Sequence, residues 1–448
     1  MARVKSGRGS AEPAAIVISL ICALLLLPAP AWAGPADLDA TFGEGGFIDL
    51  ARAPTERFPG LFAYAVDMAP GPDETVLVLS VANECSPVGC RYPMIVTRYG
   101  ADGSLDRSYG DRGSAMPALV GNGEARLAVD SQGRASIAVK EGVAVHVVRL
   151  AADGSPDHSF GSRGEAVAPG ARNSLIDLAV AADDKIVVES DWYIQHPGNR
   201  NGHLKDAGKA TTAVSVTRFL PDGRPDPSFG GTGTVKASFR RASPPTAMAV
   251  RPGRGGVLLA GRTCCSPHPV PYLVRILAGG RVDRGFAHLP GLRRLRRSQG
   301  VFVNALMLGR GGEVDLAGSV EWGRYEADRR GFLLRLRADG MPDRRFGRGG
   351  TRLPGLPIDA AATDPRNRTF AVSEDASSGD LVVFRLKSGG ALDRSFSGRK
   401  GALVRGAGGG EGGVVAAYSG SHPLLFNQRI FTCRSTCPPA PVLVRFVG

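Results

Sequence analysis

A four-residue motif, Asp followed by two variable residues and an aromatic residue, recurs seven times along this chain of 448 residues. Successive copies begin about 50 to 70 residues apart, and a fixed period of this size is typical of arrays of one supersecondary unit. A Gly follows the aromatic residue in most copies. The copies run Asp39 to Phe42, Asp106 to Tyr109, Asp157 to Phe160, Asp226 to Phe229, Asp283 to Phe286, Asp343 to Phe346, and Asp393 to Phe396.

An arginine stands eight residues before six of these aspartates, at the end of a short apolar segment. An Arg and an Asp placed on either side of a tight turn can pair across neighbouring strands. Arg445 has no such Asp after it, and Asp39 has no such Arg before it. We therefore expect the segment from Asp39 to Leu50 to lie beside the C-terminal strand, with Asp39 and Arg445 as a structural latch. The six arginines are Arg98, Arg149, Arg218, Arg275, Arg335 and Arg385.

Between copies of the motif, two alternating apolar segments flank a polar turn, as in Leu127 to Val139, and this pattern is typical of a β-hairpin. With the segment that ends in Arg and the one that follows the aromatic residue, each period holds four strands. The chain has 61 Gly and 32 Pro, too many for a helical protein, and 43% hydrophobic residues, enough for a packed core. Radial closure protects the edges of such units, so the sequence predicts an all-β, seven-bladed β-propeller.

The repeated unit, a strand ending in Arg followed by Asp-Gly-x-x-Asp-x-x-Phe-Gly, resembles the delta-60 repeat, a bacterial propeller-type repeat. The segments Arg149 to Gly161 and Arg218 to Gly230 show it most clearly. The Asp-Gly hairpins are also similar to those of NHL-repeat propellers. The resemblance covers nearly all of residues 34–448, which we expect to form a single propeller, and by the NHL analogy the segment from Asp39 to Leu50 is an outermost strand. It is specific for architecture and says almost nothing about chemistry.

Residues 1–33 have the pattern of a secretory signal peptide. Arg3, Lys5 and Arg8 precede an apolar run from Ala14 to Leu27, and Ala31-Trp32-Ala33 is a small-x-small cleavage pattern. The run is shorter than the roughly 20 residues that span a bilayer, and no later segment could span one either. We expect cleavage after Ala33 and export of a monomer without a transmembrane segment to the periplasm or the exterior; an uncleaved anchor is the alternative.

Six cysteines remain after this cleavage, and an even number in an oxidising compartment predicts disulfides. All six fall in the loop between the second and third strands of a predicted blade, so local pairing is the simplest connectivity. The vicinal pair is either a rigid loop clamp or part of a redox or ligand surface. Metal binding by the last pair would need further ligands, and no His motif accompanies it. The pairs are Cys85 with Cys90, Cys264 with Cys265, and Cys433 with Cys437.

The same class of loop carries the aromatic residues that we select as candidate ligand contacts. Exposed aromatic side chains on one face suggest recognition, although packing of these rings on their own blade is equally compatible with the sequence. Arginines of the connection before the fifth blade are predicted to share that face and to make it electropositive, unless they only reflect an Arg-rich composition. The candidates are Trp192, Tyr193, His196, Trp322, Tyr325, Arg293, Arg294, Arg296 and Arg297.

Catalytic motifs are absent from the sequence: the seven His are scattered, and there is no nucleophile elbow and no phosphate loop. The Asp-Gly-x-x-Asp clusters lack the ligand spacing of a known calcium loop, so we expect neither metal nor cofactor. Export favours a protein or an anionic glycan or other envelope component as partner, and no nucleic acid. We therefore favour an exported binding scaffold. The alternatives are an envelope hydrolase, lyase or oxidoreductase with an axial site, and a structural module of a larger surface assembly.

Overall fold

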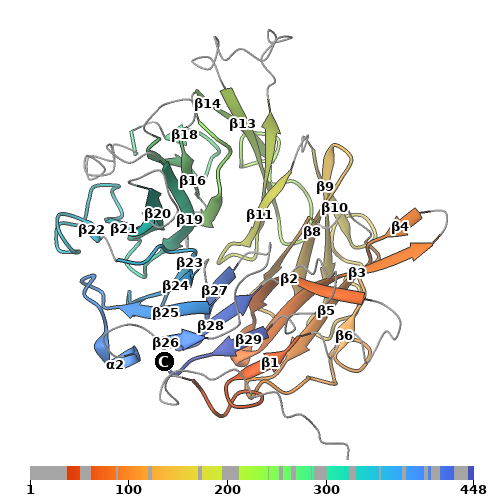
Figure 1. The fold of residues 1–448 in the computed structure, drawn as a ribbon. Helices are drawn as coiled ribbons and strands as arrows, with labels where there is room; N and C mark the ends of the chain where they lie inside the picture. Colours follow the sequence, from red (N-terminus) through yellow and green to blue (C-terminus); the bar gives the residue numbers. More distant parts are fainter. Residues whose placement is uncertain are drawn as a thin grey trace, which may run out of the picture.

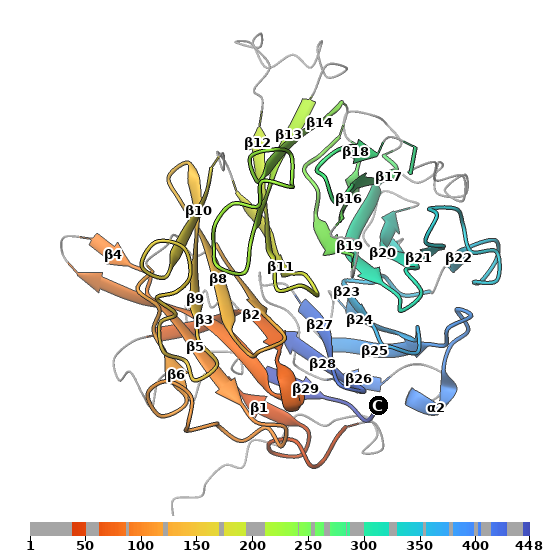
Figure 2. The ribbon, with the colours of Figure 1, turned by 180° about the vertical axis from the view of Figure 1, so that it is seen from behind.

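Seven antiparallel sheets arranged around a common centre make up the chain in a computed structural model (Figures 1 and 2). This is the predicted seven-bladed β-propeller, and the sheets are its blades. The structure describes residues 38–50, 62–86, 89–119, 124–169, 174–193, 211–240, 242–251, 256–263, 269–283, 285–286, 300–321, 329–352, 355–375, 380–397, 402–404, 414–427 and 442–448. The predicted signal peptide lies outside these residues.

Each blade has four main strands, in chain order from the centre outward except in blade 7, and the first blade carries the extra strand β4. Blades 1 to 3 comprise β2 (Phe62–Pro70), β3 (Val76–Ser86), β4 (Gly89–Arg91), β5 (Met94–Tyr99) and β6 (Ser114–Ala115); β7 (Ala125–Val129), β8 (Ala135–Glu141), β9 (Ala144–Leu150) and β10 (Glu165–Pro169); and β11 (Leu175–Val180), β12 (Ile186–Tyr193), β13 (Thr211–Phe219) and β14 (Thr234–Arg240).

Blades 4 to 6 comprise β15 (Ala247–Val250), β16 (Val257–Arg262), β17 (Pro271–Ile276) and β18 (Val282–Asp283); β19 (Gly300–Leu308), β20 (Val314–Glu321), β21 (Arg329–Leu336) and β22 (Thr351–Arg352); and β23 (Ala360–Thr363), β24 (Thr369–Asp375), β25 (Asp380–Leu386) and β26 (Ala402–Val404). Blade 7 comprises β27 (Val414–Ser419), β28 (His422–Asn427), β29 (Val442–Arg445) and β1 (Phe47–Asp49). The described helices are the short η1 (Pro72–Glu74) and α2 (Arg394–Ser397), and neither is long or apolar enough to cross a membrane.

The first and last described strands meet in blade 7, where β1 pairs with β29 and becomes the outermost strand, as expected (Figure 1). The regular pairing is shorter than the predicted strand from Asp39 to Leu50, because the motif turn occupies the first part of that segment. Arg445 Nε lies 2.8 Å from Asp39 Oδ2, so the expected ion pair joins residues 406 positions apart.

The strand directions give the propeller two faces. The turn face carries the hairpin turns between the first and second strands, such as that between β11 and β12, and the Asp-Gly turns that follow the motif arginines. The opposite loop face carries the other strand ends, where Tyr193 pairs with Thr212 and Arg240 with Thr211. Seven hydrophobic clusters fill the spaces between successive blades. The molecule therefore has a ring of interblade cores rather than one central core.

The motif residues join each blade to the next. In all seven blades the Arg guanidinium stacks over the buried aromatic ring of the motif, with its carbon 3.9 to 4.6 Å from the ring centre. The amide of the Gly after the ring donates to the Asp-Gly turn of the following blade, as from Gly161 to the carbonyl of Asp222 at 2.7 Å. The sequence repeat therefore encodes interblade contacts as well as turns.

Two blades depart from the predicted pattern. In blade 4 the short outer strand β18 ends at Asp283, so it precedes the motif aromatic instead of following it. In blade 5 Arg335 does not pair with Asp343, its predicted partner. Asp315 stands directly opposite Arg335 in the register and forms a two-pronged ion pair with it, at 2.7 and 2.5 Å. In five other blades the Arg and Asp eight residues apart do pair, and in blade 7 Arg445 pairs with Asp39.

Candidate functional site

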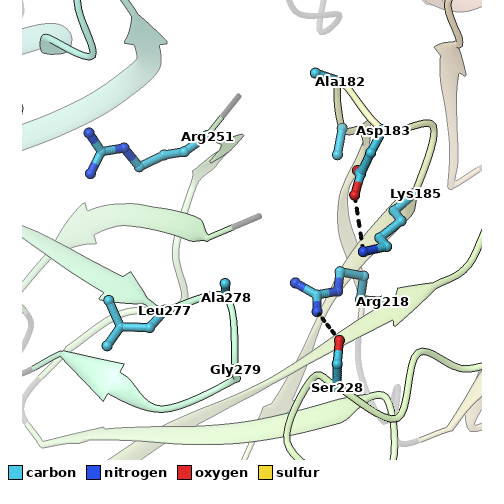
Figure 3. A pocket seen from close by; sticks show the side chains of 10 residues that line it. Ala182, Asp183, Lys185, Arg218, Ser228, Arg251, Leu277, Ala278 and Gly279 are labelled. Carbon is cyan, nitrogen blue, oxygen red and sulfur yellow. Dashed lines mark hydrogen bonds and ion pairs between the residues drawn. The ribbon is translucent and has the colours of Figure 1, made fainter. Parts of the chain in front are cut away.

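A cleft of about 950 Å³ lies on the turn face between blades 3 and 4. The β11–β12 turn contributes Asp183 and Lys185, and the blade 3 motif contributes Arg218 and Ser228. Lys185, Arg218 and Ser228 lie together on one side, and Arg251 lies on the other with Leu277 (Figure 3). The cleft therefore forms where turns from two successive periods of the repeat face each other.

Ion pairs hold the side of this cleft that blade 3 forms. Arg218 Nε is 2.8 Å from Asp226 Oδ2, and Arg218 Nη2 donates to Ser228 Oγ at 3.0 Å. Lys185 Nζ lies 3.0 Å from Asp183 and 3.5 Å from Asp226. Burial acts to raise the pKa of Asp226, but hydrogen bonds from Ser228 and the charges of Arg218 and Lys185 outweigh it and lower that pKa. Asp226 is therefore ionised at neutral pH and orients both cations.

Two more clefts continue from the first one across blades 4 and 5. A cleft of about 570 Å³ shares Arg251 with the first and also contains Arg275 and Arg310. The third, of about 900 Å³, shares Gly311 and Ala338 with the second. We call these three contiguous clefts the trough. It crosses the turn face of blades 3 to 5.

The trough is predominantly cationic. Its lining holds twice as many cationic side chains as carboxylates: Lys185, Arg218, Arg251, Arg275, Arg310, Arg337, Arg344 and Arg345 against Asp183, Glu313, Asp339 and Asp343. Arg310, Arg337, Arg344 and Arg345 are exposed. The ion pair of Arg337 with Asp339, at 2.7 Å, is exposed on both sides, and pairs of this kind hold their partners weakly. These guanidinium groups can therefore turn to a ligand.

The turn face has a different charge at the ring closure. The cleft between blades 7 and 1 has a volume of about 450 Å³ and contains Asp39, Glu74, Asp102 and His422 beside Arg445. His422 Nδ1 lies 3.5 Å from Glu74, and Nε2 lies 4.0 Å from Asp39. Cationic side chains therefore do not outnumber carboxylates in this cleft. The excess of cationic side chains belongs to the trough, on the side of the ring formed by blades 3 to 5.

Carboxylates also occur on the innermost strands. Asp67 and Asp177 follow β-bulges in β2 and β11, and each accepts a backbone N–H from the next blade. Leu127 N donates to Asp67 at 2.8 Å, and Met248 N donates to Asp177 at 3.2 Å. Burial raises the pKa of both groups, that of Asp67 to about 6. Because these carboxylates accept interblade hydrogen bonds, we interpret them as joints between blades.

Glu189 is fully buried on β12, directly opposite Asp177. Neither of its carboxyl oxygens has a hydrogen-bond partner within the described part of the chain. Burial, together with the charges of Asp177 and Asp191, raises its pKa well above the ordinary value. The arrangement therefore favours a neutral carboxyl group between blades 3 and 4. Among the described residues, no group of His, Cys, Asp or Glu is arranged to hold a metal ion.

Most of the candidate residues chosen from the sequence lie outside the described residues: His196, Trp322, Tyr325, Arg293, Arg294, Arg296, Arg297, Cys264, Cys265, Cys433 and Cys437. The backbone of Trp192 and Tyr193 ends β12 at the loop face, as expected. Cys85 and Cys90 are register partners in the β3–β4 pair, which is compatible with the predicted disulfide. The disulfides and the aromatic surface stay predictions.

Sequence reasoning missed the trough. Its walls come from turns of successive blades, and no linear motif records that three clefts join at Arg251, Gly311 and Ala338. The one available signal was composition, because Arg337, Arg344 and Arg345 cluster around the motif of blade 5. That signal was overlooked beside the longer arginine run before the same blade.

One family model agrees with the propeller fold. A family model described as "Domain of unknown function (DUF5122) beta-propeller" matches residues 133–160, which run from the β7–β8 turn to the motif aromatic Phe160. The match is narrow, and the resemblance to the delta-60 repeat stays a prediction. No curated protein matches the chain.

Solved structures match most of the chain at low identity. The β-propeller domain of the Trilobed protease from Pyrococcus furiosus is 8% identical, with a TM-score of 0.44, over 86% of this chain and 93% of that one. Chaetomium thermophilum Sqt1, bound to the N-terminus of the ribosomal protein L10, is 14% identical, with a TM-score of 0.43, over 83% and 84%. The GH93 α-L-arabinofuranosidase of Fusarium graminearum is 9% identical, with a TM-score of 0.41, over 90% and 96%. At these TM-scores the similarities carry no argument about fold or function.

Proposed function

We propose that this protein is an exported β-propeller scaffold that binds an anionic ligand, and that the trough is its binding surface. The observation that carries the proposal is the continuity of the three clefts, because it aligns cationic side chains from three blades along one path. A cleft lined with one sign of charge concentrates ligands of the opposite sign. Guanidinium groups also pair with carboxylate, sulfate or phosphate through two parallel hydrogen bonds.

The net charge of +13 agrees with an anionic partner, and the N-terminal pattern supports export. The binding surface differs from the loop face that the sequence favoured, where the aromatic and cysteine-containing loops were expected. An axial enzyme site is less well supported, since Asp67 and Asp177 accept hydrogen bonds from the backbone of neighbouring blades. The three described histidines lie elsewhere in the fold: His146 is on the third strand of blade 2, His158 is exposed in the motif turn of the same blade, and His422 is at the turn face of blade 7.

Replacing trough arginines should weaken binding of a soluble polyanion. The variant Arg310→Gln, Arg337→Gln, Arg345→Gln removes three exposed charges from the second and third clefts. We expect its affinity for polyphosphate, measured by isothermal titration calorimetry at low salt, to fall at least about ten-fold, with a shallower salt dependence.

The matched control is Arg107→Gln, Arg163→Gln, Arg394→Gln, which removes three exposed charges outside the trough. Equal losses in the two triple variants would mean that net charge alone drives binding, and the trough would be rejected. A Trp192→Ala, Trp322→Ala variant in the same titration tests the loop face. Full affinity in that variant assigns polyphosphate binding to the turn face, whereas a loss there assigns it to the loop face.

A further inference from the structure

Blade 5 alone breaks the pairing of the repeat, and the break lies in the trough. In six blades the residue opposite the motif arginine is apolar or Ser, as Leu77 is opposite Arg98 and Leu258 opposite Arg275. In blade 5 this residue is Asp315, which forms an ion pair with the guanidinium of Arg335. Because Asp315 and Arg335 are both almost fully buried, water does not compete for the hydrogen bonds of this ion pair.

Asp343 therefore has no arginine partner, whereas the motif aspartate of every other blade pairs with one. One of its oxygens accepts the backbone N–H of Arg345 at 3.1 Å, and the other has no hydrogen-bond partner within the described residues. Asp343 is half-buried and lines the third cleft with Glu313. Glu313 accepts the N–H of Gly311 at 2.9 Å. Two carboxylates with remaining acceptor capacity thus stand among the exposed Arg337, Arg344 and Arg345.

We propose that the ligand of the trough is an acidic polysaccharide, and that Asp343 and Glu313 accept hydrogen bonds from its hydroxyl groups while the arginines pair with its carboxylates. This inference rests on the proposed function. Polyphosphate, a polymer of dense charge without hydroxyl donors, binds through the arginines alone, and the two carboxylates oppose its binding. A uronate chain carries an anion and several O–H donors on each ring, so both kinds of side chain find partners. An acidic peptide offers few side-chain donors to them.

The test uses polygalacturonate and polyphosphate on the same set of variants of the full chain. Asp343→Ala removes the acceptor. Asp315→Leu installs at that position the residue found in blades 1, 4 and 7, so that Arg335 can return to Asp343 as in the other blades. Glu141→Ala removes one exposed carboxylate on the loop face and is the charge control.

We expect Asp343→Ala and Asp315→Leu each to weaken polygalacturonate binding about ten-fold, the size expected for a hydrogen bond to a charged group, and to leave polyphosphate binding unchanged or stronger. Glu141→Ala should change neither. Equal changes for both polymers, or no change for polygalacturonate, would overturn this inference while polyphosphate binding in the trough still supports the proposed function. If the binding of both polymers does not depend on the trough arginines, the proposed function itself is rejected.

Because Asp343 is half-buried and has no arginine partner, its replacement leaves the core intact, and Asp315→Leu provides a second, independent readout.

Discussion

At the scale of single residues, hydrogen-bond partners decide the charge state of each carboxylate. Asp157 accepts hydrogen bonds from Ser159 and Arg149, and although burial opposes them, these groups lower its pKa. Its contribution to stability is therefore present above the unfolded pKa of about 4 and is lost as the pH falls below it. Asp67 shows the opposite shift. It has two backbone donors and the charge of Arg126, but burial and the charge of Asp177 raise its pKa to about 6.

Asp67→Asn should therefore change how stability depends on pH. Below pH 4, where Asp67 is protonated in both states, it favours the folded wild-type protein. This contribution to the free energy of unfolding, about 3 kcal/mol, is lost as the pH rises through about 6. Urea denaturation at several pH values between 4 and 7 measures this change. We expect the difference between wild type and variant to vary over that range. A constant offset between the two curves would contradict the raised pKa.

The exception in blade 5 shows what could be read from single residues. Asp315 stands where the other blades have apolar residues or Ser, and this departure was visible in the sequence. The sequence reasoning paired every Arg with the Asp eight residues later, because spacing alone does not rank two acceptors. An acceptor directly across the strand pair allows both prongs of the guanidinium to bind, and this geometry decided the outcome.

At the scale of elements, the turns of one blade fit against the motif of the preceding blade without space for a side chain. A Cβ atom on Gly223 would lie 2.4 Å from the backbone nitrogen of Gly161, and Gly223 has a φ of +82°. The same contact joins Gly154 to Gly110 and Gly280 to Gly230. The sequence repeat correctly predicted the glycines as turn residues. Their role in blade packing could not be predicted, because it depends on the distance between two blades.

Gly223→Ala should destabilise the protein more than Gly231→Ala. Both glycines have a φ of +82°, so both replacements strain the backbone alike, but a Cβ on Gly231 has no atom within 4 Å. The difference isolates the interblade contact, and we expect it to be about 1 to 3 kcal/mol, as for overpacked cores. Chemical denaturation of the two variants measures it. If both variants lose the same stability, the close approach of blades 2 and 3 is not a packing constraint.

At the scale of the whole molecule, the periodicity of the sequence predicted the number of blades and the pairing of the chain ends, since both follow from one repeated unit and its incomplete copies. The trough could not be predicted in this way. It depends on how three blades, each about 60 residues long, place their turns relative to one another. The predicted loop surface, the disulfides and the signal peptide lie outside or at the border of the described residues and stay predictions.

The ring closure is the property that belongs to the whole chain, and its ion pair can be tested by exchanging the charges. Arg445 is almost fully buried, stacks over Phe42 and pairs with Asp39. Arg445→Glu places two carboxylates together and should cost about 3 to 5 kcal/mol of unfolding free energy, as expected when a buried pair is broken. Adding Asp39→Arg should restore part of this loss. Restoration is incomplete because Arg445 also donates to the carbonyl of Ala101 in blade 1.

The same exchange at Arg98 and Asp106 is the control, because this pair joins a strand to the following turn within a single blade. Both double-mutant cycles should show coupling between the two charges. Only the Arg445→Glu variant should also make blade 7 sensitive to limited proteolysis under native conditions, since the seam is held between the two ends of the chain and an opened seam exposes unpaired strand edges. Additive effects of the two substitutions at the seam would show that Asp39 and Arg445 do not act as a latch, and that the pairing of β1 with β29 closes the ring without them.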